Sequence, residues 1–302
     1  MRAFVLGAGG NLGAMQVGAL RSLLERNIYP DLLVGCSVGG LNAAFLAQNL
    51  SLDGVERLKQ MWLTVRLSDV YPDSLLSKAW RLLTGKDSLF DNQNFYRFLM
   101  NKGLKPDYTF GDIQDAKLLI TAANLQSGKL HVFGNSPRER VIDALMATTA
   151  LPPFHAPWEV NGKRYIDGGA VTCLPIRVAI EQGATEIYVL RVEQSEQEAD
   201  KLSRRGVVNV VRNSIHNMIR AHADYDLLLA RHTPGVRMHY VQLTAPEGCN
   251  RNILKTIPGL IQRGFQITEA TFQPQLRLPT LEKPYAIEGW PRLHYESALQ
   301  SV

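Results

Sequence analysis

The five residues Gly35-Cys36-Ser37-Val38-Gly39 constrain the fold of this chain more than any other stretch. They form a G-x-S-x-G pattern between an apolar run, Leu32–Val34, and a helix-like stretch, Leu41–Ala47. A serine in this pattern sits on a tight turn with strained backbone angles, and the following helix aims its N-terminus at the hydroxyl. The pattern predicts a strand–turn–helix unit that carries a nucleophilic serine. The same residues also suit an ordinary glycine-rich turn.

The segment before this turn repeats the same order of elements. Arg2–Leu6 is a short apolar run that ends in glycine, which favours a buried parallel strand. Gly7–Gly10 predicts a turn, and apolar residues recur with helical spacing after Asn11, the expected N-cap. Strand, helix, strand and helix at short intervals predict an α/β fold with a parallel sheet.

Further elements are predicted along the rest of the chain from periodicity and turn residues. Strands are expected over 117–123, 129–133, 185–190 and 236–243, a small hairpin over 159–165, and helices over 139–148, 207–232 and 252–272. With 302 residues and no repeat or clear linker, one domain over 1–302 is the simplest partition. It divides into a catalytic core over about 2–195, a mainly helical part over about 200–275, and an irregular tail over 276–302.

Composition narrows the classes of protein. Three widely spaced cysteines, Cys36, Cys173 and Cys249, form neither a disulfide framework nor a metal-binding pair, so a reducing compartment is expected. The apolar start of the chain is too short for a secretory signal, and no run reaches the roughly 18 residues of a membrane span. A cytoplasmic protein is expected, with peripheral contact at a membrane surface left open. The net charge of +5 favours anionic surfaces only weakly, and no nucleic-acid motif is present.

The glycine loop Gly7–Gly13 opens a helix directly after the first predicted strand, and two functions compete for it. The spacing of its glycines resembles a dinucleotide-binding loop, which also needs an acid or a base at the end of the second strand. Cys36 and Ser37 occupy that end, and Asp31 lies at the opposite one. The alternative is an oxyanion hole, because glycine N–H groups at a helix start can stabilise negative charge. Both loops leave the carboxyl edge of the sheet, so the glycine loop should face Ser37.

A base for Ser37 is harder to find among the histidines. The chain has seven, none in a hydrolase-like motif, and His155 is the best of them. Asp167 is the other candidate, since it follows a strand-like run and precedes Gly168-Gly169, which leaves its carboxylate room to reach another loop. The usual pKa of an aspartate is about 4, which makes it a weaker base than histidine near neutral pH unless burial raises that pKa. Asp-Gly-Gly by itself also suits a plain turn.

Taken together and in this order, these motifs resemble the patatin-like phospholipase family. The resemblance covers roughly residues 2 to 195 and rests on the glycine loop continuing to Leu20, the Gly35–Gly39 turn, Ala147–Pro152, Tyr165–Val171 and Leu174–Ile176. It implies a three-layer α/β/α fold with a mostly parallel sheet. One position departs from the family pattern: Leu12 stands where the glycine loop usually carries Arg or Lys, which bears on the choice of headgroup.

The resemblance implies a serine acyl hydrolase that needs neither metal nor cofactor. Ser37 would be the nucleophile and Asp167 the base, with an oxyanion hole at the amides of Gly9, Gly10 and Asn11. The glycines Gly7, Gly35, Gly39, Gly168 and Gly169 would shape the turns. The expected reaction is calcium-independent cleavage of fatty-acyl esters of lipids, as in a phospholipase A. Alternatives are an acyltransferase on the same core and a lipid-binding protein without catalysis.

Two segments are candidates for contact with a lipid surface. Leu75–Leu83 is apolar, aromatic and basic, as an interfacial helix would be, although a helix packed on the core fits too. Arg205, Arg212, His216 and Arg220 fall on one side of a predicted helix, opposite Val207, Val211, Ile215 and Met218. That basic side could meet an anionic membrane or simply face water.

Overall fold

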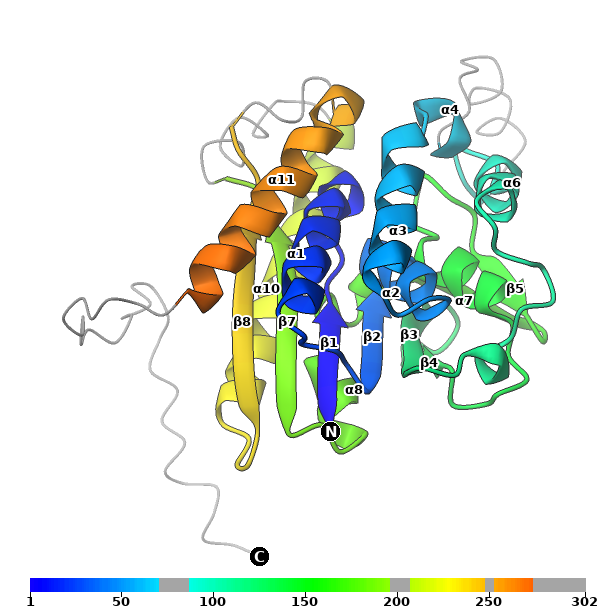
Figure 1. Cartoon of the computed structure of the whole chain (residues 1–302). Helices are drawn as coiled ribbons and strands as arrows, with labels where there is room; N and C mark the ends of the chain where they lie inside the picture. The colour runs from blue at the N-terminus through cyan, green and yellow to red at the C-terminus, as the bar shows by residue number, and fades with distance from the viewer. Residues whose placement is uncertain (71–86, 196–206, 248–252, 274–302) are drawn as a thin grey trace, which may run out of the picture. The chain divides into compact units, whose positions relative to one another are not determined.

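The computed structural model describes residues 1–70, 87–195, 207–247 and 253–273 (Figure 1). Met1–Phe272 forms one compact unit. Leu75–Leu83, Arg205, Cys249 and the tail expected over 276–302 lie outside the described residues.

The described part of the chain is built on a central sheet in the order β5-β6-β3-β2-β1-β7-β8, with β4 also paired to β3. The parallel part comprises β1 (Arg2–Leu6), β2 (Leu32–Cys36), β3 (Lys117–Asn124), β7 (Glu186–Glu193) and β8 (Arg237–Thr244). The antiparallel additions are β4 (Leu130–Phe133), β5 (Trp158–Val160) and β6 (Lys163–Asp167). The predicted α/β class and mostly parallel sheet are confirmed, as is the predicted hairpin over 159–165, which β5 and β6 form.

Helices cover both faces of the sheet, which gives the three layers. Successive side chains of β1 point to opposite faces of the sheet, so Phe4 and Leu6 pack in one core and Ala3 and Val5 pack in the other. The first core packs against α1 (Ala14–Glu25), α2 (Val38–Ala47), α3 (Leu52–Thr64), α7 (Val141–Thr148) and α11 (Ile253–Phe272). The second packs against α8 (Ile176–Glu181) and α10 (Val207–Arg231), which lie behind the sheet in Figure 1.

The helices α1 and α11 lie against each other on the front of the sheet (Figure 1). A Cβ on Gly18 would come within 1.9 Å of the carbonyl oxygen of Ile261, and one on Gly264 within 1.9 Å of that of Met15. Only glycine allows this approach of the two backbones. The helix expected over 252–272 therefore packs closely on α1 and the first core.

One detail of the sequence prediction is wrong. The backbone from Gly10 to Gly13 forms a turn of 3₁₀-helix before α1 begins, and the N-cap position of α1 is Gly13, with no side-chain cap. Asn11 is therefore inside the tighter turn and does not cap α1. The reason is the glycine loop, whose tight turn displaces the start of the regular helix by several residues.

Smaller elements complete the region beside β3. The segment between α3 and α7 contains α4 (Leu67–Val70), α6 (Gln93–Asn101) and a short 3₁₀ turn, Phe110–Asp112. Of the helices described, none is long and apolar enough to cross a bilayer.

Candidate active site

Ser37 stands between β2 and α2 on a strained turn. Its φ of 54° and ψ of −125° lie in a region that side chains other than glycine rarely adopt. The turn also presses the backbone of Gly39 against β1, because a Cβ there would lie 2.1 Å from the carbonyl oxygen of Leu6. The strand–turn–helix geometry predicted from the G-x-S-x-G pattern is present.

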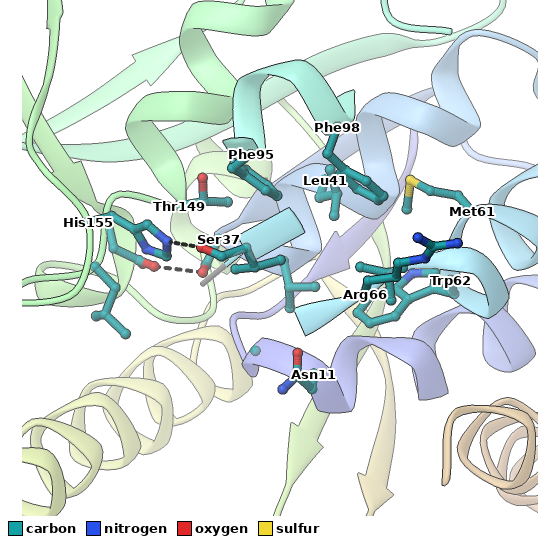
Figure 2. A pocket seen from close by; sticks show the side chains of 16 residues that line it. Asn11, Ser37, Leu41, Met61, Trp62, Arg66, Phe95, Phe98, Thr149 and His155 are labelled. Atoms are coloured by element: carbon teal, nitrogen blue, oxygen red, sulfur yellow. Dashed lines mark hydrogen bonds between the residues drawn. The ribbon is translucent and has the colours of Figure 1, made fainter. Parts of the chain in front are cut away.

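The register of β3 brings Asp167 to this serine. The last residue of β2, Cys36, pairs with Thr121 of β3, and the next residue of β3, Ala122, pairs with Asp167. Thr121 pairs with β2 on one side and with β4 on the other, and Ala122 pairs with β6 on one side and with β4 on the other. The strands β2 and β6 therefore lie one after the other along the same edge of β3. Ser37 leaves β2 at the point where β6 arrives. Its Oγ donates a 2.7 Å hydrogen bond to Asp167 Oδ2 (Figure 2).

Asp167 is held in one orientation and shielded from water. Asp167 is only 5% exposed, and its Oδ1 accepts a 2.8 Å hydrogen bond from the backbone N–H of Gly169. Burial raises the pKa of Asp167 from 3.8 to about 6, although the hydrogen bonds from Ser37 and Gly169 work against this rise. A carboxylate with this pKa is ionised at neutral pH and is a stronger base than an exposed aspartate.

Thr148 forms a hydrogen bond with the backbone of the serine turn. The backbone N–H of Ser37 donates a 2.7 Å hydrogen bond to Thr148 Oγ1, and the Thr148 hydroxyl donates a 2.6 Å bond to the carbonyl oxygen of Thr121. This fully buried threonine at the end of α7 ties the strained turn to β3. The sequence analysis quoted the segment Ala147–Pro152 without assigning Thr148 a role, because no local pattern points to a contact 111 residues away.

Thr148→Val is expected to lower kcat for ester hydrolysis about 10-fold. Valine keeps the shape of threonine, but leaves the N–H of Ser37 and the carbonyl of Thr121 without this partner, so the turn loses its anchor. Steady-state kinetics on a p-nitrophenyl ester would measure the change. Thr271→Val is the matched control, because the Thr271 hydroxyl donates to the carbonyl of Ile267 within α11 and Thr271 lines neither cavity. Equal effects of the two substitutions would contradict a specific role for Thr148.

The glycine loop lies beside the nucleophile, as expected from the carboxyl edge of a parallel sheet. Gly10 and Asn11 line one cavity together with Ser37, and Gly7, Gly9 and Gly10 line a second cavity that also reaches Ser37. Leu12 is 5% exposed and contributes to the second cavity and to the core. Gly168 and Gly169 form a short 3₁₀ turn directly after Asp167.

The first of these cavities is mainly apolar. Figure 2 shows Ser37 and His155 toward one side of it and Met61, Trp62 and Arg66 toward the other. Its other apolar lining residues are Val38, Leu41, Val65, Val70, Phe95, Phe98 and Leu151. Such a lining can pack closely around a hydrocarbon chain.

The second cavity also has a mainly apolar lining, but more charged residues border it. It shares Gly10, Ser37, Leu151 and Asp167 with the first, and adds the side chains of Arg191, Glu193, Gln194 and Arg220. Arg191 is buried and ion-paired with Asp224 at 2.6 Å and with Glu193. Arg220 lies exposed on α10. Ser37 and Asp167 therefore line both cavities, and the second of them borders the charged residues of β7 and α10.

His155 lines the apolar cavity, and its Nε2 bonds to the backbone of Val70 rather than to Ser37. Its Nε2–H donates a 3.0 Å hydrogen bond to the carbonyl oxygen of Val70, and burial lowers the pKa of the imidazole. Asp167 occupies the position beside Ser37 Oγ that a catalytic histidine would need. The geometry thus favours the carboxylate, the choice that the sequence left open.

The two described cysteines carry free, buried thiols. Burial raises the pKa of Cys173 to about 12 and that of Cys36 well above its usual value, so both remain protonated and unreactive. Among the described residues, no cluster of His, Cys, Asp and Glu could hold a metal ion.

Sequence similarity relates the chain to a known protein family. The family model described as patatin-like phospholipase matches residues 4–180 of the chain. The chain belongs to the patatin-like phospholipase family. The matched range contains the glycine loop, the Ser37 turn and Asp167, and the resemblance noted in the sequence is confirmed.

Curated relatives are much longer proteins. Lysophospholipase NTE1 of Candida albicans is 25% identical over 193 residues, which covers 62% of this chain and 13% of that protein. Patatin-like phospholipase domain-containing protein 7 of Rattus norvegicus is 27% identical over 191 residues, with 63% and 13% covered. The chain thus spans about an eighth of these relatives. Among solved structures, VipD from Legionella pneumophila has a TM-score of 0.50 at 12% identity, covering 89% of this chain and 66% of that one, which supports the three-layer fold.

Proposed function

We propose that this patatin-like protein is a serine acyl hydrolase that cleaves fatty-acyl esters of lipids, as a phospholipase A or a related lipid acyl hydrolase does. The observation that carries the proposal is the 2.7 Å hydrogen bond from Ser37 to a buried Asp167 at the mouth of an apolar cavity. A protein that only bound lipid would need neither the strained serine nor a carboxylate whose pKa is raised to about 6. Membership of the family supports the same reaction class.

In the proposed mechanism, Ser37 Oγ attacks the ester carbonyl carbon while Asp167 takes the hydroxyl proton. The carbonyl oxygen becomes an oxyanion, and the amides of Gly9, Gly10 and Asn11 would stabilise it. As the carbonyl re-forms, the C–O bond to the alcohol breaks, the alcohol leaves with the proton from Asp167, and an acyl-enzyme on Ser37 remains. Water then gives a proton to Asp167 and attacks the acyl group, which releases the fatty acid and restores Ser37 with that proton.

The proposal places the two halves of the substrate in the two cavities. The apolar cavity, with Trp62, Phe95 and Phe98 in its wall, suits the acyl chain. The second cavity suits the alcohol half, because the polar residues Arg220 and Gln194 line it together with the same serine. An ester bound across Ser37 would place its carbonyl carbon between these two environments.

Arg220→Ala is expected to raise KM for a monoacylglycerol phosphate about 5- to 10-fold, because a guanidinium–phosphate hydrogen bond is lost. KM for the uncharged monoacylglycerol with the same chain should stay unchanged. Arg231→Ala is the control, since Arg231 is an exposed arginine at the end of the same helix and does not line the cavity. Equal KM changes for both substrates would contradict a headgroup contact by Arg220.

Peripheral contact with a lipid surface is part of the proposal. On α10, Val210, Met218, Tyr225 and Leu228 are all more than half exposed, and Arg220 is exposed on the same helix. Met218, predicted to lie opposite a solvent-facing basic side, is therefore itself at the surface.

Wild-type protein is expected to float with anionic phospholipid vesicles, and Met218→Glu combined with Leu228→Glu should reduce the bound fraction. Glutamates at these positions would set like charges against the anionic surface and replace apolar contact area. Leu52→Glu, a matched change at an exposed leucine of α3, should leave the bound fraction unchanged. Absence of wild-type flotation would overturn the membrane part of the proposal.

The function itself is tested by hydrolysis of a p-nitrophenyl ester series in EDTA, together with labelling by a fluorophosphonate probe. Hydrolysis in EDTA and labelling of Ser37 would support a metal-independent serine hydrolase. Product analysis with an added alcohol would distinguish acyl transfer from hydrolysis. Absence of both activity and labelling would overturn the proposal in favour of a non-catalytic lipid-binding protein.

A further inference from the structure

A chain of polar side chains is buried beneath the glycine loop and uses none of the residues assigned above to catalysis. Trp62 Nε1 donates a 2.8 Å hydrogen bond to Asn42 Oδ1, and Asn42 Nδ2 donates one of 2.8 Å to Gln16 Oε1. Gln16 and Asn42 are both 0% exposed, although their neighbours in α1 and α2 are almost all apolar. Each of the three residues comes from a different helix: α1, α2 and α3.

The free ends of this chain reach both ends of the glycine loop. Gln16 Nε2 donates to the carbonyl oxygen of Gly7 at 2.8 Å and to that of Leu190 at 3.2 Å. Asn42 Nδ2 donates to the carbonyl oxygen of Gly13 at 2.9 Å. Gly7 is the first residue of the loop and Gly13 is the last, so the two amides hold it at its start and its end.

Burying two primary amides in a core is costly unless every donor and acceptor is paired. Here the pairing is complete, since the NH₂ group of each amide has two acceptors and each amide oxygen has a donor. Apolar residues of the same volume would fill the space without that requirement. Unlike apolar side chains, the amides fix the orientation of the loop carbonyls through hydrogen bonds. They thereby also fix the orientation of the loop N–H groups relative to α2.

We infer that Gln16 and Asn42 are positioning residues that hold the glycine loop in register with Ser37, and that Trp62 connects this support to the acyl cavity. Asn42 lies on α2, the helix that starts at Ser37, so the same helix carries the nucleophile and fixes the loop. The indole of Trp62 lines the apolar cavity and bonds to Asn42. Pressure on Trp62 from a bound chain therefore reaches the loop through two hydrogen bonds. This inference rests on the proposed hydrolase function.

The variants Gln16→Met, Asn42→Leu and Trp62→Phe test it. Each replaces a hydrogen-bonding side chain with an apolar one of similar or smaller size. Thr268→Val is the control for stability, because it removes a fully buried hydrogen bond within α11, from Thr268 Oγ1 to the carbonyl of Gly264, that does not involve Gln16, Asn42 or Trp62. Kinetics are measured on p-nitrophenyl acetate, whose acetyl group is too short to fill a cavity that extends from Ser37 to Trp62.

We expect each variant to lower kcat on the acetate ester about 10-fold or more with KM nearly unchanged, since a displaced oxyanion donor costs transition-state binding. Thr268→Val should lose comparable thermal stability and keep its kcat. The double variant of Gln16 and Asn42 should lose less kcat than the product of the two single losses, because the two amides share one hydrogen bond.

Three results would overturn the inference: kcat on the acetate unchanged in Trp62→Phe, kcat loss that merely follows melting temperature across all variants including Thr268→Val, or fully additive effects in the double variant. Trp62→Phe is the mildest change and keeps the test decisive if the amide variants do not fold. Wild-type protein that neither hydrolyses the acetate nor reacts with a fluorophosphonate would instead refute the proposed function.

Discussion

Replacing Ser37 with alanine is expected to lower kcat for ester hydrolysis by at least about 10⁴-fold, because no other group in the site can form the acyl-enzyme. The alanine keeps the turn, and the cavities on either side are unchanged. The measurement is hydrolysis of p-nitrophenyl butyrate, followed by mass spectrometry of the fluorophosphonate adduct, which should be absent.

Ser37→Gly provides the structural control for this substitution. Glycine tolerates the φ of 54° that strains serine, so the variant should be inactive and yet about 1 kcal/mol more stable in urea unfolding. An inactive but stabilised protein would attribute the loss of activity to chemistry and not to unfolding. Substantial activity in either variant would refute Ser37 as the nucleophile.

Asp167→Asn is expected to lower kcat/KM about 10³-fold or more, because an amide cannot accept the proton of Ser37. The wild-type enzyme should lose kcat/KM as the pH falls, with a midpoint near pH 6, since the pKa of Asp167 is raised to about 6 and only the carboxylate is a base. A pH–rate profile from pH 4 to pH 9 would measure this. A midpoint near pH 4 or no acid limb would contradict the role of the buried carboxylate.

The same substitution should stabilise the fold, and by an amount that depends on pH. The pKa of Asp167 is higher in the folded chain than the ordinary value of 3.8, so the folded state binds more protons between these values and loses stability as pH rises through them. Asparagine does not ionise and avoids this loss. One pKa unit corresponds to about 1.4 kcal/mol, so the stability gain should approach about 3 kcal/mol above pH 6 and vanish below about pH 4.

Thermal melts of wild type and Asp167→Asn at pH 4 and pH 8 would show the difference. Glu159→Gln, at an exposed carboxyl on β5, is the control and should change the melting temperature little at either pH. A stability gain of the same size at both pH values would point to packing and not to ionisation. A loss of stability at pH 8 would contradict the unfavourable burial of the charged carboxylate.

Much of the site could be predicted because its parts are local. The G-x-S-x-G turn, the glycine loop and Asp167-Gly168-Gly169 each depend on residues within a few positions of one another, and each forms the turn that its glycines indicate. The expected N-cap at Asn11 failed for a local reason too, because the 3₁₀ turn at Gly10–Gly13 delays α1. The choice between His155 and Asp167 could not be made locally, since it depends on which side chain the sheet brings to Ser37.

The sequence by itself determined the alternation of strands and helices, the strained serine turn and the two candidate residues Ser37 and Asp167, because periodicity and turn chemistry act over short distances along the chain. Only the tertiary structure decided that these residues meet. Their contact spans 130 residues and depends on β2 and β6 sharing one edge of β3. The support from Thr148, Gln16 and Asn42 is likewise tertiary, because a buried polar side chain is recognised by the partners that folding brings to it.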